Sequence, residues 1–120
     1  MDPSRRDVRL EPRVPVRLRV IVFGASPDRP ETEMTTRDLS SGGALCDSAL
    51  PIPLGKPLKI RLDLTNDAGM PHPVILEAIA LRVEGTGPCA IAFHFTQAPE
   101  RIREQVRRFV VRALRPAAPG

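Results

Sequence analysis

The segment from Leu58 to Leu64 restricts the possible folds most strongly, because apolar and charged side chains alternate along it without a break. Its apolar positions are Leu58, Ile60, Leu62 and Leu64, and its charged positions are Lys59, Arg61 and Asp63. Successive side chains of a β-strand point to opposite faces, so this pattern predicts a strand with one buried face. Residues 66–69, Asn-Asp-Ala-Gly, follow after Thr65 and predict a hairpin turn. The chain therefore has to form antiparallel β-structure around an apolar core.

Further segments repeat the β-pattern at short spacing. We expect additional strands over residues 14–22, 31–37, 44–48, 74–83 and 90–95, and a loop over residues 24–30. Pro51 and Pro53 exclude a central strand between residues 50 and 55, since neither residue can donate a backbone hydrogen bond. Many short strands joined by turns are typical of a β-sandwich or a small barrel, and the pattern alone favours neither.

The period changes near the C-terminus, where a helix is predicted over residues 99–114. Its apolar stripe at helical spacing consists of Ile102, Val106, Phe109, Val110, Ala113 and Leu114. Pro99 suits the first helical position, and Glu100 suits the positive end of the helix. The opposite face carries six arginines, which we expect to be solvated while the stripe packs against the strands.

Composition limits the class of protein. With 120 residues, 42% of them hydrophobic, the chain is long enough for one domain with a modest core. Its net charge of +4 favours contact with anions. Four phenylalanines are the only aromatic residues, which disfavours proteins that bind single-stranded nucleic acids or sugars by stacking. We see no secretory signal and no apolar stretch of membrane-spanning length, and we expect a cytoplasmic protein.

The cysteines and histidines form no metal-binding pattern. Cys46 and Cys89 lie far apart, and we interpret them as two reduced thiols in the core. His72 and His94 have no third ligand at a metal spacing, so we expect both on the surface. The sequence thus predicts no metal site and no cofactor.

Two short motifs carry the candidate chemistry. Asp38, Ser40 and Gly43 form the pattern Asp-x-Ser-x-x-Gly at a tight turn, where the glycines permit positive φ and a close approach of another group. By itself this stretch could be an ordinary hairpin turn. Upstream, Arg9 and Arg13 form an Arg-x-x-x-Arg element that ends directly before a predicted strand. Arg5 and Arg9 have the same spacing, but only Arg13 adjoins the strand, so we favour the pair Arg9 and Arg13.

In this order and separation, the two motifs resemble those of the PilZ domain, a bacterial receptor module for cyclic di-GMP. The resemblance covers most of the chain, from residue 5 to the end of the predicted helix. It implies an all-β fold with one C-terminal α-helix, namely a six-stranded antiparallel β-barrel of the split-barrel type. It divides the chain into a flexible arm over residues 1–13, a barrel over residues 14–96 and a helix over residues 99–114.

The resemblance also implies roles for the motif residues. Arg9 and Arg13 would hold guanine and phosphate, Asp38 and Ser40 would fix a guanine edge, and Gly43 would keep the turn open. The roles of Arg9 and Arg13 fit the chemistry of arginine, because its guanidinium group can donate to guanine O6 and N7 together and can also bind a phosphate. A carboxylate is a suitable acceptor for the N1–H and 2-amino donors on the opposite edge of guanine.

The sequence is also compatible with two functions other than a cyclic di-GMP receptor. The chain could be a PilZ-like interaction domain without ligand binding, or a basic nucleic-acid-binding barrel, which the scarcity of aromatic residues disfavours. An enzyme is disfavoured as well, because Asp38, Ser40, Ser41 and His94 match no nucleophile elbow or oxyanion-hole pattern. The sequence identifies neither a downstream protein partner nor an oligomeric state.

Overall fold

The computed structural model describes residues 12–115, which form seven strands and one helix. The strands are β1 (Arg13–Pro15), β2 (Arg19–Ser26), β3 (Arg29–Ser40), β4 (Gly43–Ser48), β5 (Leu58–Thr65), β6 (Pro71–Glu84) and β7 (Cys89–Gln97). The helix is α2 (Glu100–Leu114), and it begins after Pro99, which is its N-cap residue.

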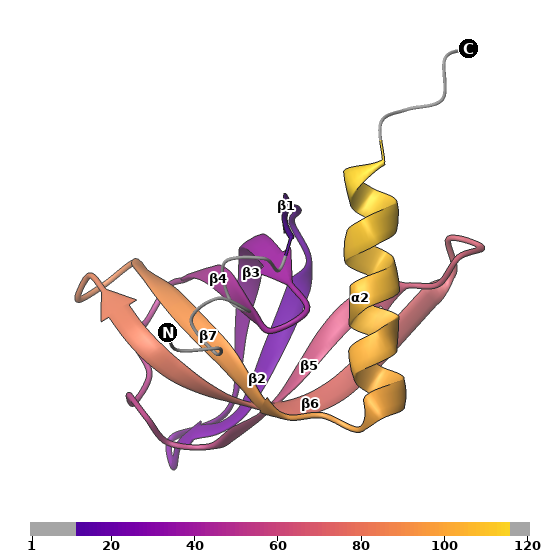
Figure 1. Cartoon of the computed structure of the whole chain (residues 1–120). Coiled ribbons are helices and arrows are strands. Elements are labelled where there is room, and N and C mark those ends of the chain that lie inside the picture. Colours follow the sequence, from indigo (N-terminus) through magenta and orange to yellow (C-terminus); the bar gives the residue numbers. More distant parts are fainter. Residues whose placement is uncertain (1–11, 116–120) are drawn as a thin grey trace, which may run out of the picture.

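Six strands close into an antiparallel barrel in the order β3-β2-β5-β6-β7-β4, with β4 pairing back to β3 (Figure 1). This confirms the predicted six-stranded barrel with one C-terminal helix and decides against a sandwich. The short strand β1 pairs with the last residues of β3, with Arg13 opposite Ser40 and Pro15 opposite Asp38. Strand β1 therefore brings the start of the described chain to the end of β3.

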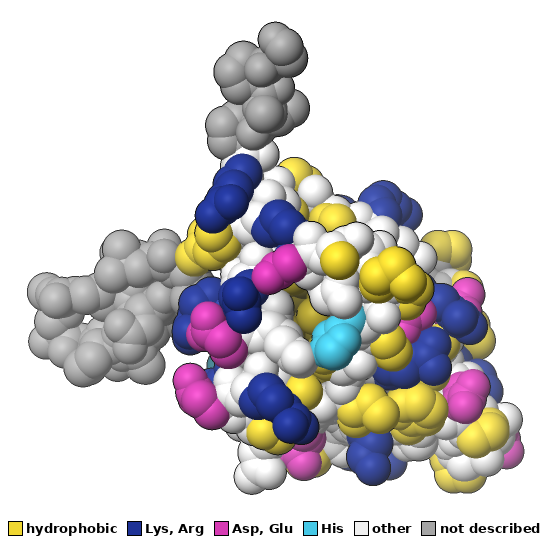
Figure 2. Space-filling view, turned by 90° about the vertical axis from the view of Figure 1, so that its right-hand side faces the viewer, with side chains coloured by type: hydrophobic (Ala, Val, Ile, Leu, Met, Phe, Trp, Pro, Cys, Tyr) yellow, Lys and Arg dark blue, Asp and Glu magenta, His cyan; other side chains and the backbone are white. Residues whose placement is uncertain are grey.

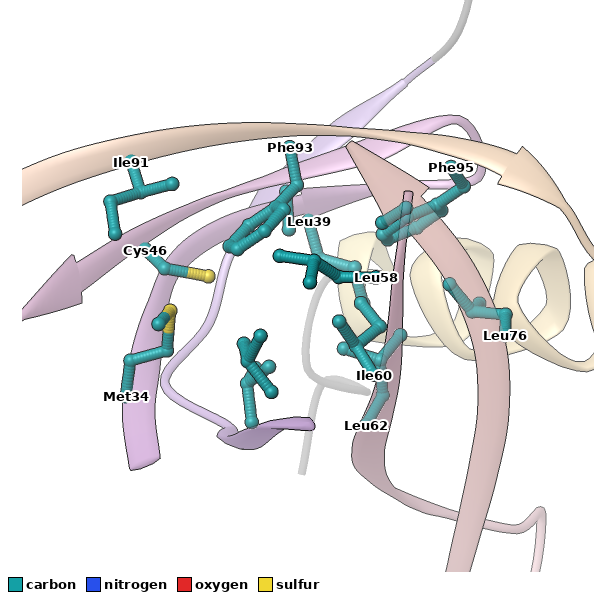
Figure 3. Close-up of a cluster of buried hydrophobic side chains, with 14 of the residues drawn as sticks. Met34, Leu39, Cys46, Leu58, Ile60, Leu62, Leu76, Ile91, Phe93 and Phe95 are labelled. Atoms are coloured by element: carbon teal, nitrogen blue, oxygen red, sulfur yellow. The ribbon is translucent and has the colours of Figure 1, made fainter. Parts of the chain in front are cut away.

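The inward side chains of the barrel strands meet in one apolar core (Figure 3). On β5 the predicted alternation is confirmed, since Leu58, Ile60, Leu62 and Leu64 are at most 3% exposed. Burial of each such side chain stabilises the fold by about 1.5–3 kcal/mol. A one-residue slip of β5 would turn all four side chains towards solvent, so this row fixes the register of the barrel.

Helix α2 packs against the barrel and contacts β1, β3, β5 and β6. Val106, Phe109 and Val110 are buried and join the core, while Ile102 is partly buried against it. Leu114 and its neighbour Ala113 were expected to complete the apolar stripe, but both are exposed. The last turn of the helix lies beyond the barrel, so no strand covers that end of the stripe (Figure 1).

Two helix arginines hold α2 to the β5–β6 hairpin. Arg108 and Arg112 both form ion pairs with Asp67 in the predicted turn, and Arg112 Nη2 donates to the Thr65 carbonyl oxygen at 2.9 Å. The Arg112 guanidinium also lies 5.5 Å from the centre of the Phe109 ring, within cation–π range. The basic helix face that was expected to be solvated is therefore partly used for packing.

One strand prediction and one loop prediction need correction. The strand expected over residues 14–22 is interrupted at residues 16–18. There the Thr36 side chain takes the place of strand pairing, because its Oγ1 donates to the Val16 carbonyl oxygen and accepts from the Leu18 N–H. The loop expected over residues 24–30 is shorter, because β2 continues to Ser26 and β3 begins at Arg29.

Along the described part of the chain, no helix is both long and apolar enough to cross a membrane.

Candidate ligand-binding site

Four of the five residues predicted to bind a ligand lie around the point where β3 ends. Asp38 and Ser40 are on β3, Gly43 begins β4, and Arg13 begins β1 opposite Ser40. The fifth residue, Arg9, lies outside the described residues. The predicted arm over residues 1–13 is also outside them, except for its last two residues, and Arg13 is part of the sheet.

Arg13 and Asp38 form an ion pair between β1 and β3, in which Arg13 Nη1 donates to Asp38 Oδ1. Their side chains are 54% and 27% exposed, so both charged groups can be reached from solvent. An exposed pair of this kind contributes at most about 1 kcal/mol to stability. An anionic or hydrogen-bonding ligand can therefore replace the pair at low cost.

Ser40 shapes the turn between β3 and β4. It is only 3% exposed, and its Oγ accepts from the Gly42 N–H and donates to the Gly43 carbonyl oxygen, both at 3.3 Å. The Gly42 carbonyl oxygen accepts a bond of 2.9 Å from the Phe95 N–H of β7. These contacts give Ser40 a structural part in the site, beside the role in ligand binding that the resemblance implies.

Gly43 is required by the close approach of β7. A Cβ atom at this position would lie 2.3 Å from the Phe93 carbonyl oxygen, which is far inside any normal contact. Gly43 does not have a positive φ, so that part of the sequence interpretation is wrong. In the described structure the group that approaches Gly43 closely is the backbone of β7, and the approach of a ligand to this turn stays a prediction.

A β-bulge places Arg37 next to Asp38 on the outer face. The register shifts there, with Thr36 opposite Cys46 and Asp38 opposite Leu45, so Arg37 is the extra residue of β3. Bulges often re-aim side chains beside functional sites. The sequence carried a sign of this bulge, because two adjacent charged residues stand between the buried Thr36 and the buried Leu39.

Arg37 and Arg17 both bind Asp47 of β4. Arg37 Nη2 donates to Asp47 Oδ1, and Arg17 Nη1 lies 3.3 Å from Asp47 Oδ2. The hydrogen bond and charge of Asp47 raise the pKa of Arg37, and the hydrogen bond from Arg37 is the main cause that lowers the pKa of Asp47. Sequence reasoning missed this cluster, which places the Arg37 cation beside Asp38.

Leu45, Ala92 and His94 follow these charges across the outer face of β4 and β7, the first two half-buried and the third exposed. In register, Asp38 is followed by Leu45, Ala92 and Arg82, and Ser40 is followed by Gly43, His94 and Ile79. Strand β6 lies three strands from β3 in either direction around the closed barrel, so its outer side chains face away from those of β3. The site is thus a surface around Arg13, Arg37 and Asp38, with His94 two strands from β3 on β7. Only strand register places His94 near this surface.

Comparison with known proteins agrees with this geometry. The family model for the PilZ domain matches residues 5–112 of the chain. No curated protein sequence matches the chain. Several solved structures do, among them the inhibitor of motility MotI/DgrA of Bacillus subtilis, with a TM-score of 0.73 and 16% identity. That match covers 87% of this chain but 49% of the other, so this chain spans about half the length of the Bacillus protein.

Two further solved structures are separate PilZ domains. The PilZ domain of YcgR from Escherichia coli, solved with c-di-GMP, has a TM-score of 0.69 and 15% identity, and the match covers 88% of this chain and 90% of that one. The PilZ domain of CeSA from a cellulose-synthesizing bacterium has a TM-score of 0.59 and 25% identity, with 83% and 95% covered. The two likenesses below 25% identity establish the fold alone.

Proposed function

Because the chain belongs to the PilZ domain family, we propose that it is a receptor for cyclic di-GMP that transmits the signal to a partner protein and catalyses no reaction itself. The observation that carries this proposal is the arrangement at the end of β3. There the fold brings Arg13 and Asp38 together, on one accessible surface, although 24 residues separate them in the sequence.

The surface offers a partner for each part of the ligand. Arg13 and Arg37 supply planar, bidentate donors that suit a phosphate or the O6 and N7 atoms of guanine. Asp38 supplies an acceptor for the donors on the opposite guanine edge. Leu45 and Ala92 lie opposite each other and are half-buried, and a base could pack against them.

In the free protein, the Arg13–Asp38 pair occupies the groups that the ligand needs. We expect the ligand to part this pair, so that Asp38 accepts from a guanine while Arg13 turns to the anion. Exchange of one exposed ion pair for several charge-assisted hydrogen bonds favours binding.

Isothermal titration calorimetry with cyclic di-GMP tests the proposal, with GMP and cyclic di-AMP as controls. Cyclic di-AMP should bind far more weakly, because adenine lacks guanine's donor pattern and would leave the Asp38 carboxylate without its partners. The absence of heat with cyclic di-GMP would favour the alternative, a PilZ-like interaction domain that has lost ligand binding. Equal affinity for both dinucleotides would contradict the role of Asp38.

Transmission of the signal is the second part of the proposal. Arg9 and Arg13 would bind one dianionic ligand together and thereby hold residues 5–12 across the end of the barrel, an order–disorder switch. Hydrogen exchange with and without cyclic di-GMP tests this. Protection should rise in residues 5–13 and 38–43 and change little in α2. An arm that is equally protected in both states would contradict the switch and leave the binding site untouched.

A further inference from the structure

A second surface lies at the C-terminal end of β7, where the chain leaves the barrel and enters α2. A groove of about 620 Å³ opens there between the outer face of β5, β6 and β7 and the first turns of the helix. Of the predicted ligand-binding residues, the four that the structure describes do not line it. Its volume falls within the range of ordinary binding pockets, about 300–1,000 Å³.

The floor of this groove is apolar. Ile75 lies on the outer side of β6 and is 50% exposed, whereas its neighbours Val74 and Leu76 are buried. Pro57 and Pro99 also line the groove, and Leu58 and Leu76 lie below it in the core. An aliphatic side chain of another molecule placed against Ile75 would remove apolar surface from water on both sides.

The groove contains two cations and one acid. Lys59 and Arg103 line it, and neither forms an ion pair with any residue between positions 12 and 115. Other arginines on the same outer face are paired, as Arg61 is with Asp63. The acid, Glu77, lies opposite Lys59 in the register of β5 and β6, and it accepts a hydrogen bond of 2.9 Å from Thr96 Oγ1. The groove therefore presents a net positive charge around an apolar floor.

We propose that this groove is a docking site for an acidic segment of a partner protein, with an aliphatic side chain seated on Ile75 and carboxylates facing Lys59 and Arg103. Charge complementarity and the exposed apolar floor identify this occupant. The site does not depend on the binding of cyclic di-GMP. It shares a strand with the ligand site, however, since Thr96 is two residues from His94 on β7.

The full chain can be tested with a defined probe, the acetylated and amidated peptide Glu-Glu-Leu-Glu-Glu, by two-dimensional amide NMR. We expect saturable shifts confined to residues 57–59, 75–77, 96–98 and 103. The peptides Lys-Lys-Leu-Lys-Lys and Glu-Glu-Gly-Glu-Glu should give smaller shifts, because one reverses the charge and the other lacks the anchor. Equal shifts with the lysine peptide, or no shifts in the groove, would overturn the proposal.

Matched variants separate the groove from general surface charge. Arg103→Gln should weaken the peptide about two- to fivefold, the range for one exposed ion pair, and Ile75→Ser about fivefold. Arg101→Gln is the control, because Arg101 is an exposed helix residue two positions away that lies outside the groove and forms no ion pair within residues 12–115. Equal losses with Arg101→Gln and Arg103→Gln would refute the site.

Titration of cyclic di-GMP into the same sample distinguishes this proposal from the previous one. Shifts at residues 38–43 without shifts in the groove would support two separate sites. Saturable shifts in the groove alone would identify it as the nucleotide site and overturn both assignments. If cyclic di-GMP shifts nothing while the peptide shifts the groove, the docking site stands and the receptor function fails.

Discussion

Replacement of Asp38 by alanine separates the two tasks that this carboxylate can perform. In the free protein its described ion pair is with Arg13, between side chains that are 54% and 27% exposed, so its removal should lower the free energy of unfolding by at most about 1 kcal/mol. In the complex the carboxylate would accept from a guanine edge, a contact worth about 1–3 kcal/mol. Asp38→Ala should therefore weaken cyclic di-GMP binding about 5- to 150-fold while changing thermal stability little.

The matched control for this variant is Asp63→Ala. Asp63 also lies on the outer side of a strand, its side chain is 30% exposed, and it is paired with one arginine, Arg61. Both variants should have similar melting temperatures, and Asp63→Ala should bind with unchanged affinity in calorimetry. Asp38→Asn should lose less than Asp38→Ala, because the amide oxygen still accepts. An Asp38→Ala variant that binds within twofold of the parent, or one that loses no more than Asp63→Ala, would refute the reasoning.

Three further predictions concern stability. Gly43→Ala should lower the free energy of unfolding by about 2 kcal/mol or more in chemical denaturation, because its Cβ would lie 2.3 Å from the Phe93 carbonyl oxygen. Gly87→Ala, which meets nothing within 4 Å, should be neutral, and equal effects would contradict the packing argument. Burial raises the pKa of Cys46 to about 12. Between pH 9 and 11 this thiol therefore ionises mainly in the unfolded state. The free energy of unfolding should fall there by up to about 1.4 kcal/mol per pH unit. Cys46→Ala should flatten that slope, and an unchanged slope would exclude Cys46 as its origin. Asp67→Asn should lower the free energy of unfolding by about 1 kcal/mol or less, because it releases Arg108 and Arg112. The control is Asp28→Asn, which should leave the melting temperature unchanged, because Asp28 lies in a turn and forms no ion pair among residues 12–115.

The sequence predicted the elements whose pattern is local. Alternation identified β5, and the Asn66–Gly69 turn and the change of period before α2 were equally clear. The interruption after β1 was not predictable, because it depends on hydrogen bonds between Thr36 and residues 16–18, twenty positions away. The apolar stripe of α2 also looked longer than the part that packs, since its pattern says nothing about where the barrel ends.

The candidate site was predictable on one side only. The two motifs indicated Arg13 and Asp38, and the structure brings them into contact. Asp47 and His94 carry no motif, and they join this surface through the register of β4 and β7. His94 was correctly expected to be exposed, but its position opposite Gly43 follows from tertiary pairing alone.

The site combines a rigid base with weak surface contacts, and this limits how a ligand can transmit a signal. Ser40 and Thr36 are buried and hydrogen-bonded, and Gly43 is packed against β7, so the barrel under the ligand has little freedom to move. The ion pairs above it are exposed and can be exchanged at low cost. A binding event would therefore leave the barrel unchanged and act on the elements attached to β1. These are the residues that precede Arg13 in the sequence. On this reasoning the partner should detect the position of the arm rather than a change in the barrel or in α2.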